Sequence, residues 1–322
     1  MNPPAESPAE GATEVVLAAA AAPGVAAPTA AEETPFRRIA ADFAASRIAL
    51  CGLGLFALIV LCALLAPLIS PQNPYDLAQL DVLDGRLEPG TRSGDGKRVF
   101  WLGTDDQGRD MLSAIFYGLR ISIGVGVSAT LCALALGLSL GLAAAFFGGR
   151  VDALIMRVVD IQLSFPAILI ALILLAVLGQ GVDKIIVALV AVQWAYYART
   201  VRSAALVERS KEYIEAARCL ALPGARIVFR HLLPNCLPPL IVVATVQVAA
   251  AIALEATLSF LGLGLPITEP SLGLLIANGF TYMLSGKYWI SFFPGVALLA
   301  TIVSINLVGD QLRDVLNPRL QR

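Results

Sequence analysis

Six long apolar runs alternate with short polar segments along the chain. They cover residues 46–69, 122–147, 154–178, 184–201, 237–261 and 289–309. A helix of about 20 apolar residues spans the hydrocarbon core of a bilayer, because each helical residue adds about 1.5 Å. The pattern therefore predicts an all-α integral membrane protein with six transmembrane helices.

The polar segments between these runs divide the chain into parts. Residues 1–36 are rich in Ala, Pro and Glu and contain no Lys or Arg. Such a segment buries too little apolar surface to order itself, which predicts a disordered cytoplasmic tail. Residues 37–70 are expected to form the first transmembrane helix, 71–119 an external loop, and 120–322 a five-helix core that carries a charged cytoplasmic loop at 202–236.

Composition and charge agree with a membrane protein that has both termini in the cytoplasm. Hydrophobic residues make up 57% of the chain and charged residues 15%. With the N-terminus inside, 15 of the 23 Lys and Arg residues are cytoplasmic, seven of them between Arg199 and Arg230. Cytoplasmic loops of membrane proteins carry this excess of basic residues.

Small residues in the second run predict a close helix contact. Gly137 and Gly141 lie four residues apart, so both fall on one face of a helix. In lipid, such faces let two helices approach closely. The sequence contains no G-x-x-x-x-G-K-[ST] motif, so we expect no nucleotide-binding loop in this chain.

A charged helical segment lies between the fourth and fifth runs. The small residues Ala216 and Ala217 are flanked by Glu212, Glu215 and Arg218, and Pro223-Gly224 ends the helix. A helix of this kind either docks another protein or lies on the lipid headgroups. These physical features leave both interpretations open.

The motif around this helix resembles the cytoplasmic EAA loop of bacterial ABC-importer permeases. The sequence Glu215-Ala216-Ala217 is followed by Leu233-Pro234, whereas Ala221 and His231 stand where the family pattern has Gly and Ile. The Arg-His-x-Leu-Pro-Asn sequence at 230–235 is similar to the dipeptide, oligopeptide and nickel branch. The resemblance implies these ATPase-coupling residues: Glu212, Glu215, Ala216, Ala217, Arg218, Ala221, Gly224, Arg230, His231, Leu233 and Pro234.

Further motifs extend the resemblance over residues 37–322. The external motif resembles G-T-D-x-x-G-R-D and comprises Gly103, Thr104, Asp105, Gly108, Arg109 and Asp110. Segments 160–166, 258–264 and 306–319 are also similar to that branch. The chain is thereby identified as similar to the C-type, or second, permease subunit, with an ABC importer type I permease fold.

The resemblance implies a non-catalytic subunit in the bacterial inner membrane that translocates di- or oligopeptides. Its implied partners are a second homologous permease subunit, two ATP-binding cassette ATPase subunits, an extracytoplasmic solute-binding protein and membrane lipid, with no nucleic acid. ATP and Mg would be used by the ATPase subunits, and this chain would bind no cofactor. The alternatives are import of nickel or another small solute, an ion-coupled secondary transporter and, least favoured, an intramembrane enzyme.

Acidic residues outside the loop suggest two further sites. Asp105, Asp106 and Asp110 could attract a cation, but their spacing does not fit a calcium loop, which favours a turn in which Arg109 pairs with a neighbouring Asp and no metal.

Asp160 and Glu255 lie within apolar runs and are candidates for lining a pathway, because ionisable groups in the membrane are costly. Asp160 could alternatively pair with Arg157, one helical turn before it.

Overall fold

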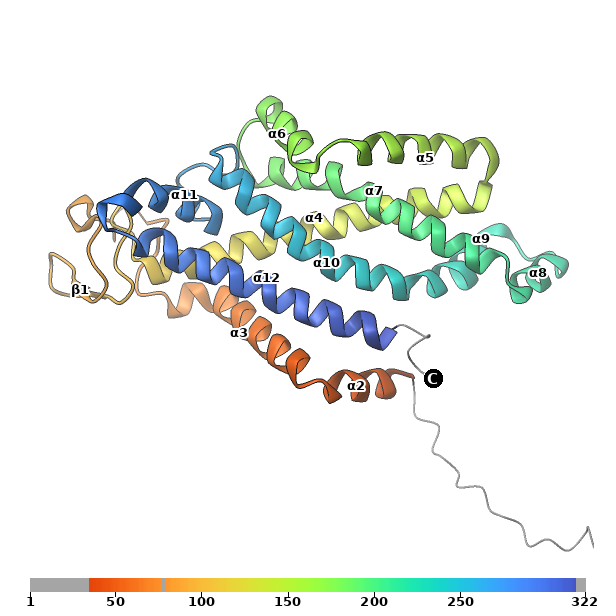
Figure 1. The fold of residues 1–322 in the computed structure, drawn as a ribbon, viewed down its shortest axis with the longest axis horizontal. Coiled ribbons are helices and arrows are strands. Elements are labelled where there is room, and N and C mark those ends of the chain that lie inside the picture. Colours follow the sequence, from red (N-terminus) through yellow and green to blue (C-terminus); the bar gives the residue numbers. More distant parts are fainter. Residues whose placement is uncertain (1–34, 77–78, 317–322) are drawn as a thin grey trace, which may run out of the picture. The chain divides into compact units, whose positions relative to one another are not determined.

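The computed structural model describes residues 35–76 and 79–316 (Figure 1). The sequence forms two units, 1–40 and 41–322. Of the predicted tail at 1–36, only the start of helix α2 (Pro35–Ala45) lies within the described residues. The 306–319 motif is described as far as Leu316, the last residue of helix α12.

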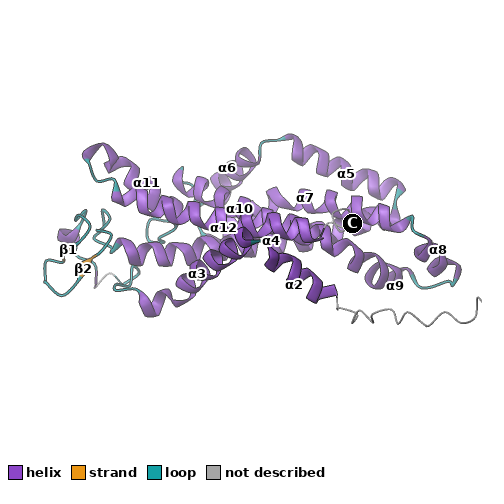
Figure 2. Ribbon diagram, turned by 60° about the horizontal axis from the view of Figure 1, so that its bottom comes forward, coloured by secondary structure: helices purple, strands orange, loops and turns teal. Residues whose placement is uncertain are grey.

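The second unit is built almost entirely of helices (Figure 2). The long ones are α3 (Arg47–Ile69), α4 (Met111–Phe147), α7 (Val182–Arg209), α10 (Leu233–Phe260) and α12 (Trp289–Leu316). The shorter ones are η2 (Val82–Asp84), α5 (Gly149–Ser164), α6 (Ala167–Leu178), α8 (Glu212–Cys219), α9 (Gly224–Arg226), η3 (Ile227–Leu232), α11 (Leu272–Tyr282) and η4 (Met283–Ser285). Strands β1 (Thr91–Arg92) and β2 (Val99–Phe100) form a small antiparallel pair.

The spanning helices agree with the predicted runs in four places. In the described part of the chain, α3, α4, α12 and the continuous helical stretch 224–260 are long and apolar enough to cross a membrane, and α5 with α6 would make a fifth span. A count of six also requires α7, which is long but more polar. Helix α4 begins at Met111, so the predicted external loop ends at 110 and not at 119.

The predicted continuous span at 154–178 is wrong in one respect, because the chain bends by 92° between α5 and α6. Phe165 adopts an extended conformation, with φ −95° and ψ 144°. The residue before a proline avoids the helical conformation, and Pro166 has no N–H to donate.

The predicted first helix at 37–70 is likewise two helices, α2 and α3. The Ser46 hydroxyl caps α3 by accepting a hydrogen bond from Ala49 N–H.

Helices α4 and α7 form the central helix pair, and α6 and α10 pack against it. Their shared apolar core comprises Val125, Ala129, Ala171, Leu175, Ile185, Ala188, Leu189, Val192, Ala251, Leu258 and Leu265. Helix α12 packs against α3, α10 and α11. The loop around α8 and the external segment with β1 lie at opposite ends of these helices (Figure 1).

The structure confirms the close helix contact predicted at Gly137 and Gly141. A Cβ atom on Gly137 would lie 2.5 Å from the Trp194 carbonyl oxygen, and one on Gly141 would lie 2.6 Å from the Ala198 oxygen. Both contacts are with the backbone of α7, which cannot move aside as a flexible side chain can. Glycine therefore sets the distance between α4 and α7.

We predict that Gly137→Ala destabilises the protein by about 1 to 3 kcal/mol, because the added methyl group forces α4 and α7 apart. The measurement is thermal unfolding of the purified protein in detergent. Gly124→Ala is the matched control, since a Cβ atom on Gly124 of the same helix has nothing within 4 Å. Equal stability of the two variants would contradict the glycine contact.

Candidate functional site

Helix α8 and the turn after it form where the sequence predicted a short surface helix. Glu212 and Glu215 lie in its first turn, where negative charge favours the helix dipole. At its end, Leu222 N–H donates to the Ala217 carbonyl (3.2 Å) and Ala221 N–H donates to the Arg218 carbonyl (2.9 Å). This is a Schellman cap, and it requires the positive φ of 51° seen at Ala221.

One face of α8 is buried and the other is open. Ala217 and Ile214 pack against Ile227 and Leu232 from the second half of the loop. The exposed residues of α8 are Glu212, Tyr213, Glu215, Ala216, Arg218 and Cys219. The small apolar cluster thus fixes α8 and leaves its charged side free for a contact with another molecule.

A chain of hydrogen bonds joins α8 to the two flanking helices. The Glu208 carboxylate, near the end of α7, accepts hydrogen bonds from Lys211 Nζ (2.6 Å) and Tyr213 OH (2.6 Å). Asn235 Nδ2 donates to Tyr213 OH (3.1 Å) and to the His231 carbonyl (2.7 Å). The role of Tyr213 was not predictable from sequence, because it joins Glu208 of α7 to Asn235, which lies 22 residues further along the chain.

The loop is also attached to the end of α4. Arg209 Nη1 donates to the Ala145 carbonyl at 2.6 Å. A Cβ atom on Gly224 would lie 2.7 Å from the Phe146 ring, so a residue without a side chain fits this contact. These two contacts join the loop to the central helix pair.

The second half of the loop runs into α10 as one helix. Residues 224–260 form a continuous helical stretch that includes the π-helical turn η3. Arg230 is exposed in η3, and Leu233 and Pro234 are the first residues of α10. The second half of the loop and the spanning part of α10 are therefore parts of one helix.

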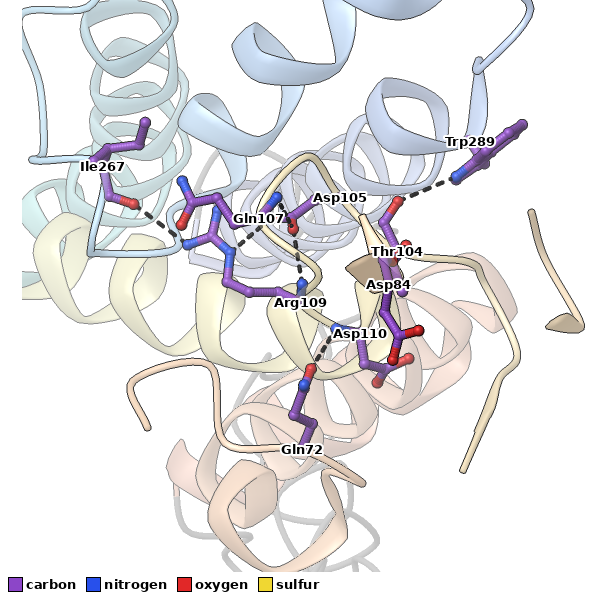
Figure 3. A network of polar contacts seen from close by, with 9 residues as sticks. All are labelled: Gln72, Asp84, Thr104, Asp105, Gln107, Arg109, Asp110, Ile267 and Trp289. Atoms are coloured by element: carbon purple, nitrogen blue, oxygen red, sulfur yellow. Dashed lines mark hydrogen bonds and ion pairs between the residues drawn. The ribbon is translucent and has the colours of Figure 1, made fainter. Parts of the chain in front are cut away.

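The external motif is built around a buried ion pair (Figure 3). Arg109 Nε lies 2.6 Å from Asp105 Oδ2, and the two side chains are 1% and 0% exposed. Asp105 Oδ1 also accepts hydrogen bonds from the backbone N–H groups of Gln107 and Arg109. The structure confirms the predicted pairing of Arg109 with a neighbouring aspartate.

This ion pair reaches across to the loop between α10 and α11. Arg109 Nη1 donates to the Ile267 carbonyl at 3.3 Å. On the other side of the motif, Trp289 Nε1 donates to the Thr104 carbonyl at 3.3 Å, and Thr104 Oγ1 donates to the Asp84 carbonyl at 2.6 Å. The motif therefore joins the external segment to two distant parts of the chain.

Asp110 and the two motif glycines shape the start of α4. Asp110 Oδ2 caps the helix by accepting a hydrogen bond from Ser113 N–H at 2.9 Å. Gly103 and Gly108 have φ angles of 80° and 77°, which glycine adopts readily.

Burial raises the pKa of Asp110, and burial together with the nearby Asp105 raises the pKa of Asp106. Across the described residues, no group of three His, Cys, Asp or Glu side chains is placed to hold a metal ion.

The two candidate pathway residues lie in different environments. Glu255 is fully buried between α4 and α10, where its carboxylate accepts hydrogen bonds from Ser122 Oγ (2.8 Å) and Ser259 Oγ (2.8 Å). Asp160 is exposed and pairs with Arg199 of α7. Asp160 therefore pairs with a residue of the neighbouring helix and not with Arg157, the partner predicted from the sequence.

Comparison with known proteins gives consistent matches over the described helices. Residues 133–322 match the family model of the binding-protein-dependent transport system inner membrane component, and residues 34–89 match the N-terminal transmembrane domain of oligopeptide transport permease C. The inward-facing MetNI methionine ABC transporter superimposes with a TM-score of 0.54 at 22% identity, covering 64% of this chain and 98% of that chain. This likeness supports a type I importer permease fold.

Three curated relatives cover most of the chain. The di/tripeptide transport system permease protein DppC of Pseudomonas aeruginosa is 37% identical over 91% of this chain and 95% of its own length. A putative peptide transport system permease protein of Brucella suis is 41% identical over 84% and 87%. The oligopeptide transport system permease protein OppC of Bacillus subtilis is 36% identical over 87% and 88%. The chain is therefore a multi-pass inner-membrane permease that belongs to the family of binding-protein-dependent transport system inner membrane components.

Proposed function

We propose that this chain is the C-type permease subunit of an ATP-driven ABC importer that carries di- or oligopeptides across the inner membrane. The peptide substrate is supported by the names of the relatives described above. The observation that carries the proposal is the loop around α8, which presents a charged face and continues into α10 as one helix. Family membership also argues against the ion-coupled transporter and the intramembrane enzyme.

In this proposal, the exposed face of α8 docks into an ATPase subunit. Ala216 allows close approach, while Glu212, Glu215 and Arg218 fix the register of the contact. When two ATPase subunits bind ATP and Mg and close, they displace α8. The hydrogen bonds of Glu208 and Asn235 pass this displacement to α7 and α10, which then move as rigid elements.

The orientation of the chain follows from the same assignment. The loop around α8 is cytoplasmic, so the external segment at the opposite end of the helices faces the side from which substrate arrives. Both termini then lie in the cytoplasm, in agreement with the distribution of basic residues. An extracytoplasmic solute-binding protein would deliver the peptide there, and a second homologous permease would complete the pathway.

The proposal is tested by the ATPase activity of the purified complex in lipid, with and without solute-binding protein that carries a dipeptide. We expect the loaded binding protein to stimulate ATP hydrolysis. An intact complex that does not respond to the dipeptide would contradict dipeptide import, and stimulation by nickel would favour the alternative solute. A complex that retains no ATPase subunit would contradict the docking role of α8.

The turn after α8 carries backbone strain that the family pattern avoids. Ala221 occupies the left-handed region, which costs an L-residue about 1 to 2 kcal/mol compared with glycine. The Schellman hydrogen bonds and the contact of Leu222 with the α8 cluster hold the turn in this conformation. The departure from the pattern is thus accommodated without loss of the cap.

We predict that Ala221→Gly stabilises α8 against local opening by up to about 1 kcal/mol, because it removes this strain. Hydrogen exchange of the α8 amides in the purified complex measures the effect as slower exchange. Ala216→Gly is the matched control and should accelerate exchange, since glycine within a helix costs about 1 kcal/mol. Faster exchange in Ala221→Gly would contradict the strained turn.

We predict that Glu215→Arg uncouples transport without unfolding the protein, because it reverses a charge on the exposed face and leaves the buried cluster intact. The measurements are dipeptide uptake and ATPase stimulation by loaded binding protein, both of which should fall. Asp42→Arg is the control, since it reverses an exposed acidic charge on α2, outside the loop around α8 and the external segment. Normal uptake by the Glu215 variant would contradict the docking assignment.

A further inference from the structure

Helix α5 presents an open face on which charged residues lie among exposed apolar ones. Its opposite side is held against α7, where Val159 is buried and Gln162 Nε2 donates to the Ala191 carbonyl at 2.9 Å. The open side carries the ion pair between Asp160 and Arg199, whose side chains remain 60% and 49% exposed. Arg157 is also exposed on this helix.

The depth of this ion pair follows from two helices. Arg209 at the end of α7 donates to Ala145 near the end of α4, so α7 ends close to the level where α5 begins. Asp160 lies 11 residues along α5 from Gly149, a rise of about 16 Å, and Arg199 lies 10 residues back along α7 from Arg209, a rise of about 15 Å. Because α7 has 28 residues and is about 42 Å long, its end at Arg209 projects beyond a hydrocarbon core of about 30 Å, and the ion pair lies in the part of the membrane nearer the loop around α8.

The break between α5 and α6 supplies independent evidence that the open face of α5 contacts protein or water. Ser164, Phe165 and Pro166 are all exposed in this chain, and the backbone there leaves the helical conformation. Non-helical backbone at membrane depth is tolerated where protein buries it or where it lines a water-filled cavity, because lipid offers no hydrogen bonds. Charged residues within the membrane are restricted in the same way.

We propose that the open face of α5, with Arg199 of α7, is a wall of the translocation pathway and contacts the charged ends of the passing peptide. This inference rests on the proposed function. Asp160 attracts the free ammonium group, and Arg157 and Arg199 attract the terminal carboxylate. The neighbouring Val158 and Ile161 are 47% and 53% exposed and offer apolar contacts to peptide side chains.

Thiol labelling tests whether water reaches this face. In a variant whose five native cysteines are replaced by alanine, Ser164→Cys is treated with a membrane-impermeant maleimide in the assembled complex. We expect labelling, and loss of labelling when dipeptide-loaded binding protein and ATP are added. Leu58→Cys in α3 is the control, because that helix has no charged residue after Arg47 and should face lipid and remain unlabelled.

Three outcomes of this experiment are informative. Absence of labelling at position 164 would overturn the inference and assign this face to the partner permease or to lipid. Labelling that a transported dipeptide does not reduce would overturn the contact with peptide. If the unmodified complex does not transport dipeptides, the proposed function fails, whereas water access at position 164 is still measured, so the two failures can be distinguished.

Substitution of the ion pair tests the specificity role. We expect Asp160→Asn to reduce the preference for a dipeptide with a free N-terminus over its N-acetylated form, measured as the ratio of their uptake rates. Asp152→Asn is the matched control, because Asp152 pairs with Arg202 between the same two helices but is only 21% exposed. An unchanged ratio for Asp160→Asn, or an equal change in both variants, would overturn the role of Asp160.

Discussion

The close contact between α4 and α7 is the constraint on which the other functional elements depend. Hydrophobic attraction does not hold helices together in lipid, so their association relies on close van der Waals packing. Gly137 and Gly141 bring the backbone of α4 against that of α7. This approach also brings the end of α4 to the end of α7, where Arg209 and Gly224 attach the loop around α8.

Polar contacts complete the structure at the two ends of the helices, where water is available and hydrogen bonds need not all be internal. At one end, Glu208, Tyr213 and Asn235 connect α8 with α7 and α10. At the other end, the buried pair of Asp105 and Arg109 connects the external segment with the α10–α11 loop. The spanning helices thus lie between two rigid anchors, as expected of elements that move as units.

Polar groups between these anchors fall into two classes. Glu255 is enclosed by the chain and accepts hydrogen bonds from two serine hydroxyls, so it contributes to the packing of α10 on α4. Asp160 and Arg199 pair with each other yet remain open on one side. The difference separates a residue that is enclosed within this subunit from residues that remain exposed on it.

Much of this protein was predictable from local sequence. The apolar runs gave the membrane class, the spacing of Gly137 and Gly141 gave a helix contact, and the motifs at 103–110 and 215–234 gave the family. Each of these depends on residues close together in the chain, because helix periodicity and turn conformation are local properties. The pairing of Arg109 with an aspartate was predictable for the same reason.

Tertiary structure decided the features that depend on distant residues. The partner of Asp160 is 39 residues away on α7, and the hydrogen bond between Tyr213 and Asn235 joins residues 22 apart. The 92° bend at Phe165-Pro166 was marked by a proline, but its direction and its exposure depend on how α5 packs on α7. Sequence alone determined which segments enter the membrane, whereas packing determined which of their polar groups remain accessible, because burial is a property of neighbouring helices.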